Sequence, residues 1–137
     1  MVKSDHEILQ HIGRTPLVTL LRIGRVRDAL WTRLVAQIPA LGLNGDSQRR
    51  LPNTLNVRFP GVAGSVVLAA APEIAASTGS ACHAGGESAS SVIVAMGVTP
   101  QEALGSIRLS LGRGTSSDDV ARAADALIQS WRDVRAA

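Results

Sequence analysis

The stretch Ile107-Arg108-Leu109-Ser110-Leu111-Gly112, residues 107–112, decides the fold class of this chain. Apolar side chains at 107, 109 and 111 alternate with Arg108 and Ser110. A period of two predicts a half-buried strand with one face toward a core and the other toward polar surroundings. Gly112 and Gly114 then close the strand.

A long amphipathic helix follows this strand. Ser116, with Asp119 three residues later, forms a capping-box signal for a helix start. Apolar residues then recur on one face as far as the C-terminus, at Val120, Ala124, Leu127, Trp131 and Val134. A strand joined by a short link to such a helix indicates a domain that mixes α and β structure.

The preceding chain repeats this pattern. Residues 55–59 and 74–77 read as further strands, and Pro60-Gly61 ends the first of them. Helices are predicted over about 24–38 (stopped by Pro39), 65–71 and 90–96. The apolar stretch 16–21 fits either a short strand or the start of a helix. We therefore expect an α/β (α+β) fold in which a sheet of three to four strands packs against helices.

Length and composition set limits on the class of protein. A chain of 137 residues makes one domain, and a single cysteine excludes an internal disulfide and a multi-cysteine metal site. No apolar run approaches the ~20 residues that cross a bilayer, and the N-terminus lacks the pattern of a secretory signal. We expect a soluble cytoplasmic protein with no membrane contact. A net charge of +3 and an aromatic content of 2% argue against a nucleic-acid partner.

The single cysteine, Cys82, lies in the run Ser-Thr-Gly-Ser-Ala-Cys-His-Ala-Gly-Gly, residues 77–86. Glycines free the backbone of this run and hydroxyl side chains keep it polar, as in an exposed loop. An exposed thiol is a candidate nucleophile. The competing interpretation is an inert cysteine, because free cysteines most often pack as small apolar groups.

Three motifs occur in the order found in cysteine desulfurases: Leu51–Val57, the loop Ser77–Cys82, and Ser106–Arg113. Over about 25–137 the chain resembles the C-terminal (small) domain of the NifS/IscS-like desulfurases, class V aminotransferases of the fold-type I pyridoxal-phosphate (PLP) enzymes. The Gly-Ser-Ala-Cys loop ending at Cys82 is similar to that of this branch.

The resemblance implies a sulfur-transfer activity. In the family, PLP held on a lysine activates L-cysteine, and the loop cysteine takes its sulfur as a persulfide. That sulfur then passes to an acceptor protein, for example in iron–sulfur cluster assembly. Cys82 matches the persulfide-forming residue, and Arg108 matches the arginine that binds the substrate carboxylate. A planar guanidinium can hold a carboxylate through two hydrogen bonds. The alternative for Arg108 is a surface arginine in an ion pair.

Two further features lie near the loop, His83 and the stretch Ser88-Ala89-Ser90. His83 follows Cys82 and could assist by lowering the pKa of the thiol, although a solvated histidine is the favoured interpretation. Ser88-Ala89-Ser90 takes the place where family members often carry Glu-Pro-Ser, so the loop is expected to be anchored more weakly. No metal site is expected, because His6 and His11 lack a helical i, i+4 spacing.

The large domain that carries the PLP lysine in the family has no counterpart in this sequence. Lys3 is the sole lysine and its neighbours match no PLP-lysine motif. Arginine cannot replace it in a Schiff base, because arginine stays protonated. The chain alone is expected to bind no cofactor and to leave cysteine intact. Activity would require a large-domain partner chain in addition to L-cysteine or a persulfide donor.

Residues 8–20 resemble the start of cysteine synthase, a PLP enzyme of a different fold. We therefore divide the chain into an N-terminal segment of uncertain structure, 1–23, and a desulfurase-like domain, 24–137. Three functions stay open: a desulfurase small domain working with a partner, a persulfide carrier without catalysis of its own, and an inactive remnant. Apolar surface once covered by the large domain would favour self-association into a homo-oligomer.

Overall fold

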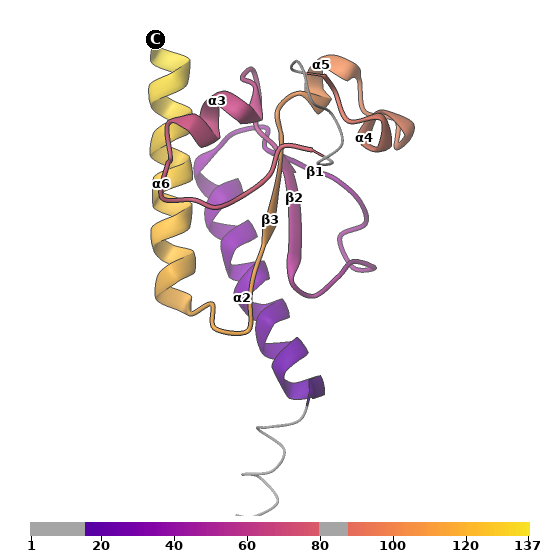
Figure 1. Ribbon diagram of the computed structural model, residues 1–137, viewed down its shortest axis with the longest axis vertical. Helices are drawn as coiled ribbons and strands as arrows, with labels where there is room; N and C mark the ends of the chain where they lie inside the picture. Colours follow the sequence, from indigo (N-terminus) through magenta and orange to yellow (C-terminus); the bar gives the residue numbers. More distant parts are fainter. Residues whose placement is uncertain (1–15, 80–87) are drawn as a thin grey trace, which may run out of the picture.

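The computed structural model describes residues 16–79 and 88–137 (Figure 1). Five helices and three strands are formed in these ranges. In chain order they are α2 (Pro16–Gln37), β1 (Gly42–Leu43), β2 (Thr54–Arg58), α3 (Gly64–Ala69), α4 (Ser91–Ala95), α5 (Pro100–Ala103), β3 (Ser106–Ser110) and α6 (Ser117–Ala136).

The three strands form an antiparallel sheet in the order β1-β2-β3. Leu55 lies opposite Leu109 and Val57 opposite Ile107, so the apolar positions of β2 and β3 share one face of the sheet. The polar positions of both strands share the other face, where Asn56 lies opposite Arg108. The alternation in 107–111 thus marks a strand with one apolar and one polar face, as predicted, and the predicted fold class is confirmed.

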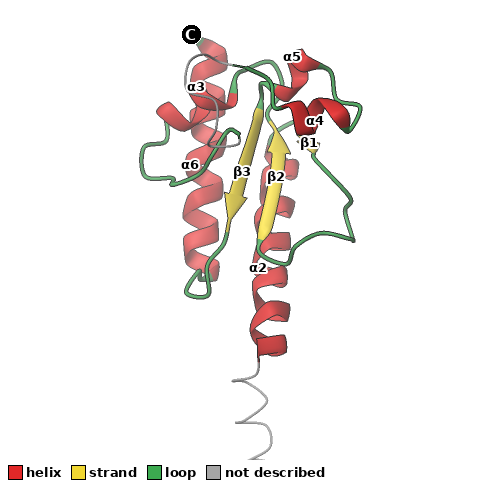
Figure 2. Ribbon diagram, turned by 45° about the vertical axis from the view of Figure 1, so that its right-hand side comes forward, coloured by secondary structure: helices red, strands yellow, loops and turns green. Residues whose placement is uncertain are grey.

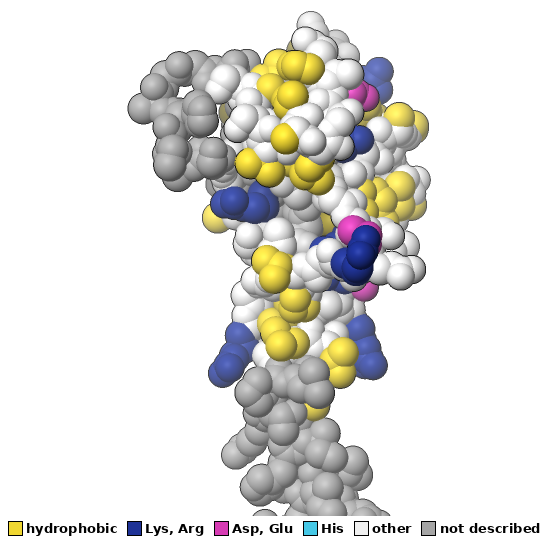
Figure 3. Space-filling view, turned by 90° about the vertical axis from the view of Figure 1, so that its right-hand side faces the viewer, with side chains coloured by type: hydrophobic (Ala, Val, Ile, Leu, Met, Phe, Trp, Pro, Cys, Tyr) yellow, Lys and Arg dark blue, Asp and Glu magenta, His cyan; other side chains and the backbone are white. Residues whose placement is uncertain are grey.

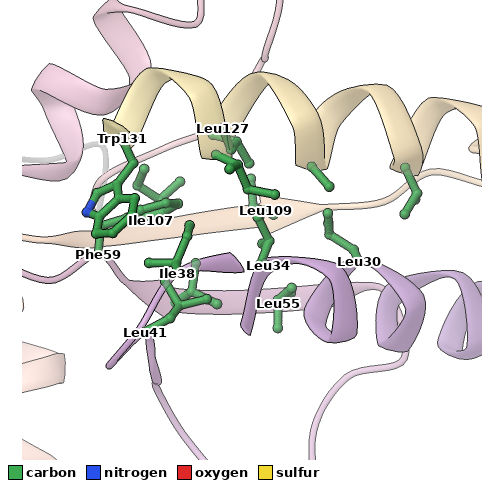
Figure 4. Close-up of a cluster of buried hydrophobic side chains, with 14 of the residues drawn as sticks. Leu30, Leu34, Ile38, Leu41, Leu55, Phe59, Ile107, Leu109, Leu127 and Trp131 are labelled. Carbon is green, nitrogen blue, oxygen red and sulfur yellow. The ribbon is translucent and has the colours of Figure 1, made fainter. Parts of the chain in front are cut away.

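Helices α2 and α6 pack against the apolar face of the sheet and run side by side in the same direction (Figures 1 and 2). The core lies between these two layers, where Leu34, Leu127 and Phe59 are almost completely buried (Figure 4). The indole N–H of Trp131 donates to the carbonyl of Pro60 at 3.2 Å, which satisfies the one polar atom of this large core side chain.

The helix start predicted by capping chemistry at Ser116 is present. Ser116 Oγ accepts the N–H of Asp119, and the Asp119 carboxylate accepts the N–H of Ser116. Thr99 and Glu102 form the same reciprocal arrangement at α5. Gly97, which follows α4, has a φ of +89°, the left-handed conformation expected of a residue that ends a helix.

The structure decides the element that the sequence left open and corrects another. Residues 16–21 belong to α2, which runs without a break past the boundary at residues 23 and 24. The prediction of a strand over 74–77 is wrong, because only Ser77 pairs with the sheet, as an isolated bridge to Arg108. Ile74 and Ala76 still pack partly against the core.

Two short elements were not predicted from the sequence. β1 has two residues, and a Cβ at its Gly42 would lie 2.7 Å from Nη2 of Arg58, so a larger residue there would displace the guanidinium. α5 has four residues. No helix within 16–79 and 88–137 is long and apolar enough to span a membrane.

Candidate functional site

The predicted site residues fall into two groups. Cys82 and His83 lie outside the described residues, so their predicted roles stay predictions. Arg108 lies in the middle of β3, on the polar face of the sheet, and its side chain is exposed. No acceptor for its guanidinium occurs among residues 16–79 and 88–137, so the ion pair considered as its alternative role is not formed there.

The backbone of Arg108 holds the segment that leads into the cysteine loop. Its N–H donates to the carbonyl of Ser77 at 2.7 Å, and the N–H of Ser77 donates back to the carbonyl of Arg108 at 3.3 Å. Ser77 Oγ then donates to the carbonyl of Gly79 at 2.8 Å, which turns the chain away from the sheet. The segment therefore leaves the sheet at a defined place beside Arg108.

A small pocket of about 150 Å³ lies at this place. Its lining includes Arg108 and Asn56 from the polar sheet face, Ser77–Gly79 from the start of the loop, and Ser90 from the point where the chain returns. Residues from both ends of the loop thus line one pocket together with Arg108, the residue predicted to bind a carboxylate.

A buried polar network supports the same sheet face and was not predicted from the sequence. Asn44, which is 8% exposed, donates from Nδ2 to Asn56 Oδ1 at 2.9 Å and to Ser106 Oγ at 3.0 Å. Asn44 Oδ1 accepts from Nη1 of Arg58, which also donates to the carbonyl of Leu43 at 3.2 Å. Asn44 begins the connector between β1 and β2, residues 44–53. The useful signal was the polar alternation at Asn56 and Arg58, since a polar residue on a covered sheet face needs a partner.

The carboxylates with shifted pKa values lie at helix starts and turns. Hydrogen bonds from Ser116 lower the pKa of Asp119, and hydrogen bonds from Thr99 lower that of Glu102. Backbone N–H groups of Arg49 and Gln48 lower the pKa of Asp46. None of the three lines the Arg108 pocket, so they stabilise local structure and contribute no acid or base to it.

The residues present do not fit a covalently held PLP. The described ranges contain no lysine, and the sole lysine of the chain, Lys3, lies outside them. No group of three or more histidine, cysteine or acidic side chains in the described ranges could hold a metal ion. The chemistry available at the described pocket is binding of an anionic group by Arg108.

Known proteins resemble most of this chain. No family model matches it. A cysteine desulfurase of Frankia sp. (strain EuIK1) is 47% identical over 96 residues, which cover 70% of this chain and 23% of that protein. The cysteine desulfurase IscS of Shewanella sp. (strain W3-18-1) is 38% identical over 114 residues, 83% of this chain and 28% of the relative. IscS of Ehrlichia chaffeensis is 32% identical over 115 residues.

Solved structures show the same fold. A NifS-like protein superimposes with a TM-score of 0.67 at 24% identity, over 81% of this chain and 27% of that one. The NifS-like protein of Rickettsia africae gives a TM-score of 0.64 at 23% identity. The chain spans about a quarter of the length of the curated relatives it matches. This protein is a partial homologue of the IscS and NifS-like cysteine desulfurases.

Proposed function

We propose that this chain acts in sulfur transfer of the cysteine desulfurase type, as a counterpart of the family's C-terminal domain. Cys82 forms a persulfide and Arg108 binds the carboxylate of the sulfur donor. The observation that carries the proposal is the meeting of both loop ends with Arg108 at one pocket. In the sequence, Cys82 comes three residues after Gly79, which lines this pocket.

The step assigned to Cys82 is a thiolate attack on a sulfane sulfur. The sulfur of Cys82 forms a new S–S bond to the terminal sulfur of a donor persulfide. The S–S bond of the donor breaks, and its inner sulfur leaves with the electron pair as a thiolate. The proton of the terminal sulfur stays on it, so Cys82 ends as a persulfide. Thiolates are the reactive form of cysteine in such exchanges.

A large-domain partner chain would supply what this chain lacks for using L-cysteine directly. That partner would hold PLP and deliver the sulfur of L-cysteine to Cys82. Apolar side chains exposed in the region of the connector and α4 support a partner of this kind (Figure 3). Leu51 is 66% exposed and Val92 64%, values that fit a surface covered by another chain.

The test combines the chain with a truncated IscS that keeps its PLP domain and lacks its C-terminal part. Addition of L-cysteine should yield alanine only when both chains are present. The Cys82→Ser variant should abolish turnover, and Arg108→Gln should raise the KM for L-cysteine because it removes the carboxylate partner. Alanine formation that does not depend on Cys82 would rule out the assigned role.

A carrier function is the second candidate, and the lack of a lysine in the described ranges favours it. In this case Cys82 accepts sulfur from the persulfide of another protein and passes it to a sulfur-acceptor protein. Mass spectrometry after incubation with a persulfide-charged sulfurtransferase should show one added sulfur on the wild type and none on Cys82→Ser. An unmodified wild type in this assay, together with no alanine in the first, leaves an inactive remnant.

A further inference from the structure

A second cleft, separate from the Arg108 pocket, lies between the end of β2, β1 and α5. It has a volume of about 490 Å³, within the 300–1,000 Å³ range of ordinary small-molecule sites. Arg58 and Glu102 contribute its charged groups, and Phe59, Val62 and Leu104 contribute apolar surface. None of these five residues lines the Arg108 pocket.

The guanidinium of Arg58 is held in place before any ligand arrives. Its Nη1 is bound to the carbonyl of Leu43 and to Asn44 Oδ1. Its Nε, Cζ and Nη2 all lie within 2.9 Å of the position that a Cβ on Gly42 would take, so this group packs over the backbone of Gly42. Neither Nε nor Nη2 has an acceptor among the described residues, which leaves two adjacent donors for a carboxylate.

Glu102 presents the opposite charge. Its Oε2 accepts from the N–H and the hydroxyl of Thr99, which holds the carboxylate in one orientation and lowers its pKa. Its other oxygen accepts no hydrogen bond within the described ranges. Arg58 contributes to the lowered pKa through its charge, yet the two groups do not form an ion pair, whose N···O separation would be 4.0 Å or less. A gap therefore remains between two fixed, opposite charges.

The backbone at the rim of this cleft is also unusual. Ala40 has a φ of +62°, the one positive value of a non-glycine residue in the described ranges. Such a conformation is costly for alanine and is maintained only where the surrounding structure requires it. Gly61, on the same rim, has a φ of +72°. Both residues shape the wall that the charged groups face.

We propose that this cleft binds a small zwitterion of the aliphatic α-amino acid class. The ligand carboxylate accepts from Nε and Nη2 of Arg58, its ammonium group donates to Glu102, and its side chain lies on Val62 and Leu104. An amino acid carries both charges, one for each of these groups, whereas a simple anion would be repelled by Glu102. This site does not depend on the sulfur-transfer function.

The test is an NMR titration of the full chain with L-leucine, read from the backbone amides of Gly61, Val62 and Leu104. L-leucine should shift these amides. N-acetyl-L-leucine, which lacks the ammonium charge, and L-leucinamide, which lacks the carboxylate, should each bind about tenfold more weakly, as expected for loss of a charge-assisted hydrogen bond. Equal binding of all three, or no shift at the solubility limit of L-leucine, would overturn the proposal.

Three variants locate the site. Glu102→Gln keeps a residue able to form the capping box but removes the charge, so it should weaken L-leucine about tenfold and should not weaken N-acetyl-L-leucine, which lacks the ammonium group. Gly42→Ala displaces the guanidinium without removing its charge and should weaken both ligands. Glu73→Gln, which removes one negative charge at an exposed position outside the cleft, is the matched control.

The outcomes of these variants are decisive even if one of them fails to fold. An effect of Glu73→Gln equal to that of Glu102→Gln would assign the binding to net charge and overturn the proposal. If Gly42→Ala loses the native amide spectrum, the comparison of the three ligands on the wild type still decides. Cys82→Ser should leave the L-leucine titration unchanged, so this proposal and the proposed function fail separately.

Discussion

Ser77 and Arg108 exchange two backbone hydrogen bonds, and no other residue of the 74–77 segment pairs with the sheet. The residue that opens the cysteine loop is therefore fixed to the residue expected to bind the substrate carboxylate. Because Cys82 follows Ser77 by five positions, the two backbone bonds limit where the loop can begin.

The first prediction removes this link. Ser77→Pro deletes the N–H that donates to Arg108, and the rigid ring also disturbs the return bond. Hydrogen exchange at the Arg108 amide should speed up strongly, and persulfide formation at Cys82 should slow. Ser77→Ala keeps both backbone bonds and is the control. Unchanged protection of the Arg108 amide in Ser77→Pro would show that the bridge is not formed in solution.

The second prediction concerns the Asn44 network. Asn44→Ala leaves Asn56 Oδ1 and Ser106 Oγ without their donor in a buried place. The free energy of unfolding, measured in urea, should fall by about 1–3 kcal/mol. Gln48→Ala, at an exposed position in the same connector, should change it by less than about 0.5 kcal/mol. Equal effects of the two substitutions would contradict the network.

The third prediction is a dependence of stability on pH at the start of α6. The folded pKa of Asp119 lies below that of the unfolded chain, which is about 3.9. Its contribution is therefore fully present above the unfolded pKa and is lost as the pH falls through the folded pKa.

Thermal melts between pH about 6 and about 2.5 should show this loss in the wild type and a smaller one in Asp119→Asn. Asp118→Asn lies in the same first turn but outside the capping box, and it should keep the wild-type profile. A profile of Asp119→Asn that matches the wild type would mean that the cap does not operate in solution.

The fourth prediction compares two glycines. A Cβ at Gly105 would lie 2.3 Å from the carbonyl oxygen of Phe59, whereas a Cβ at Gly114 meets nothing within 4 Å. Gly105→Ala should lower the free energy of unfolding by at least about 1–3 kcal/mol, the usual cost of forcing extra atoms into a packed region. Gly114→Ala should be near neutral. A neutral Gly105→Ala would show that β2 and the turn before β3 are farther apart than described.

Much of the fold could be predicted because its signals are local. The alternation at 107–111 fixed the buried side of β3, and Ser116 with Asp119 fixed the start of α6. The prediction of a strand over 74–77 was wrong because strand pairing depends on residues distant in the sequence. Ile74 and Ala76 have the right spacing for a strand, but a strand also needs a paired neighbour, and only Ser77 obtains one.

The sequence by itself determined the apolar faces of the strands and long helices and the start of α6, and its resemblance to a family selected Cys82 and Arg108 as candidates. The faces and the helix start depend on side chains a few positions apart, where backbone geometry sets which face each one occupies. Tertiary structure alone decided that the loop ends meet Arg108, that Asn44 joins three strands, and that Arg58 packs over Gly42. Each of these contacts joins residues whose separation in the chain carries no periodic signal, so they arise only when the layers pack.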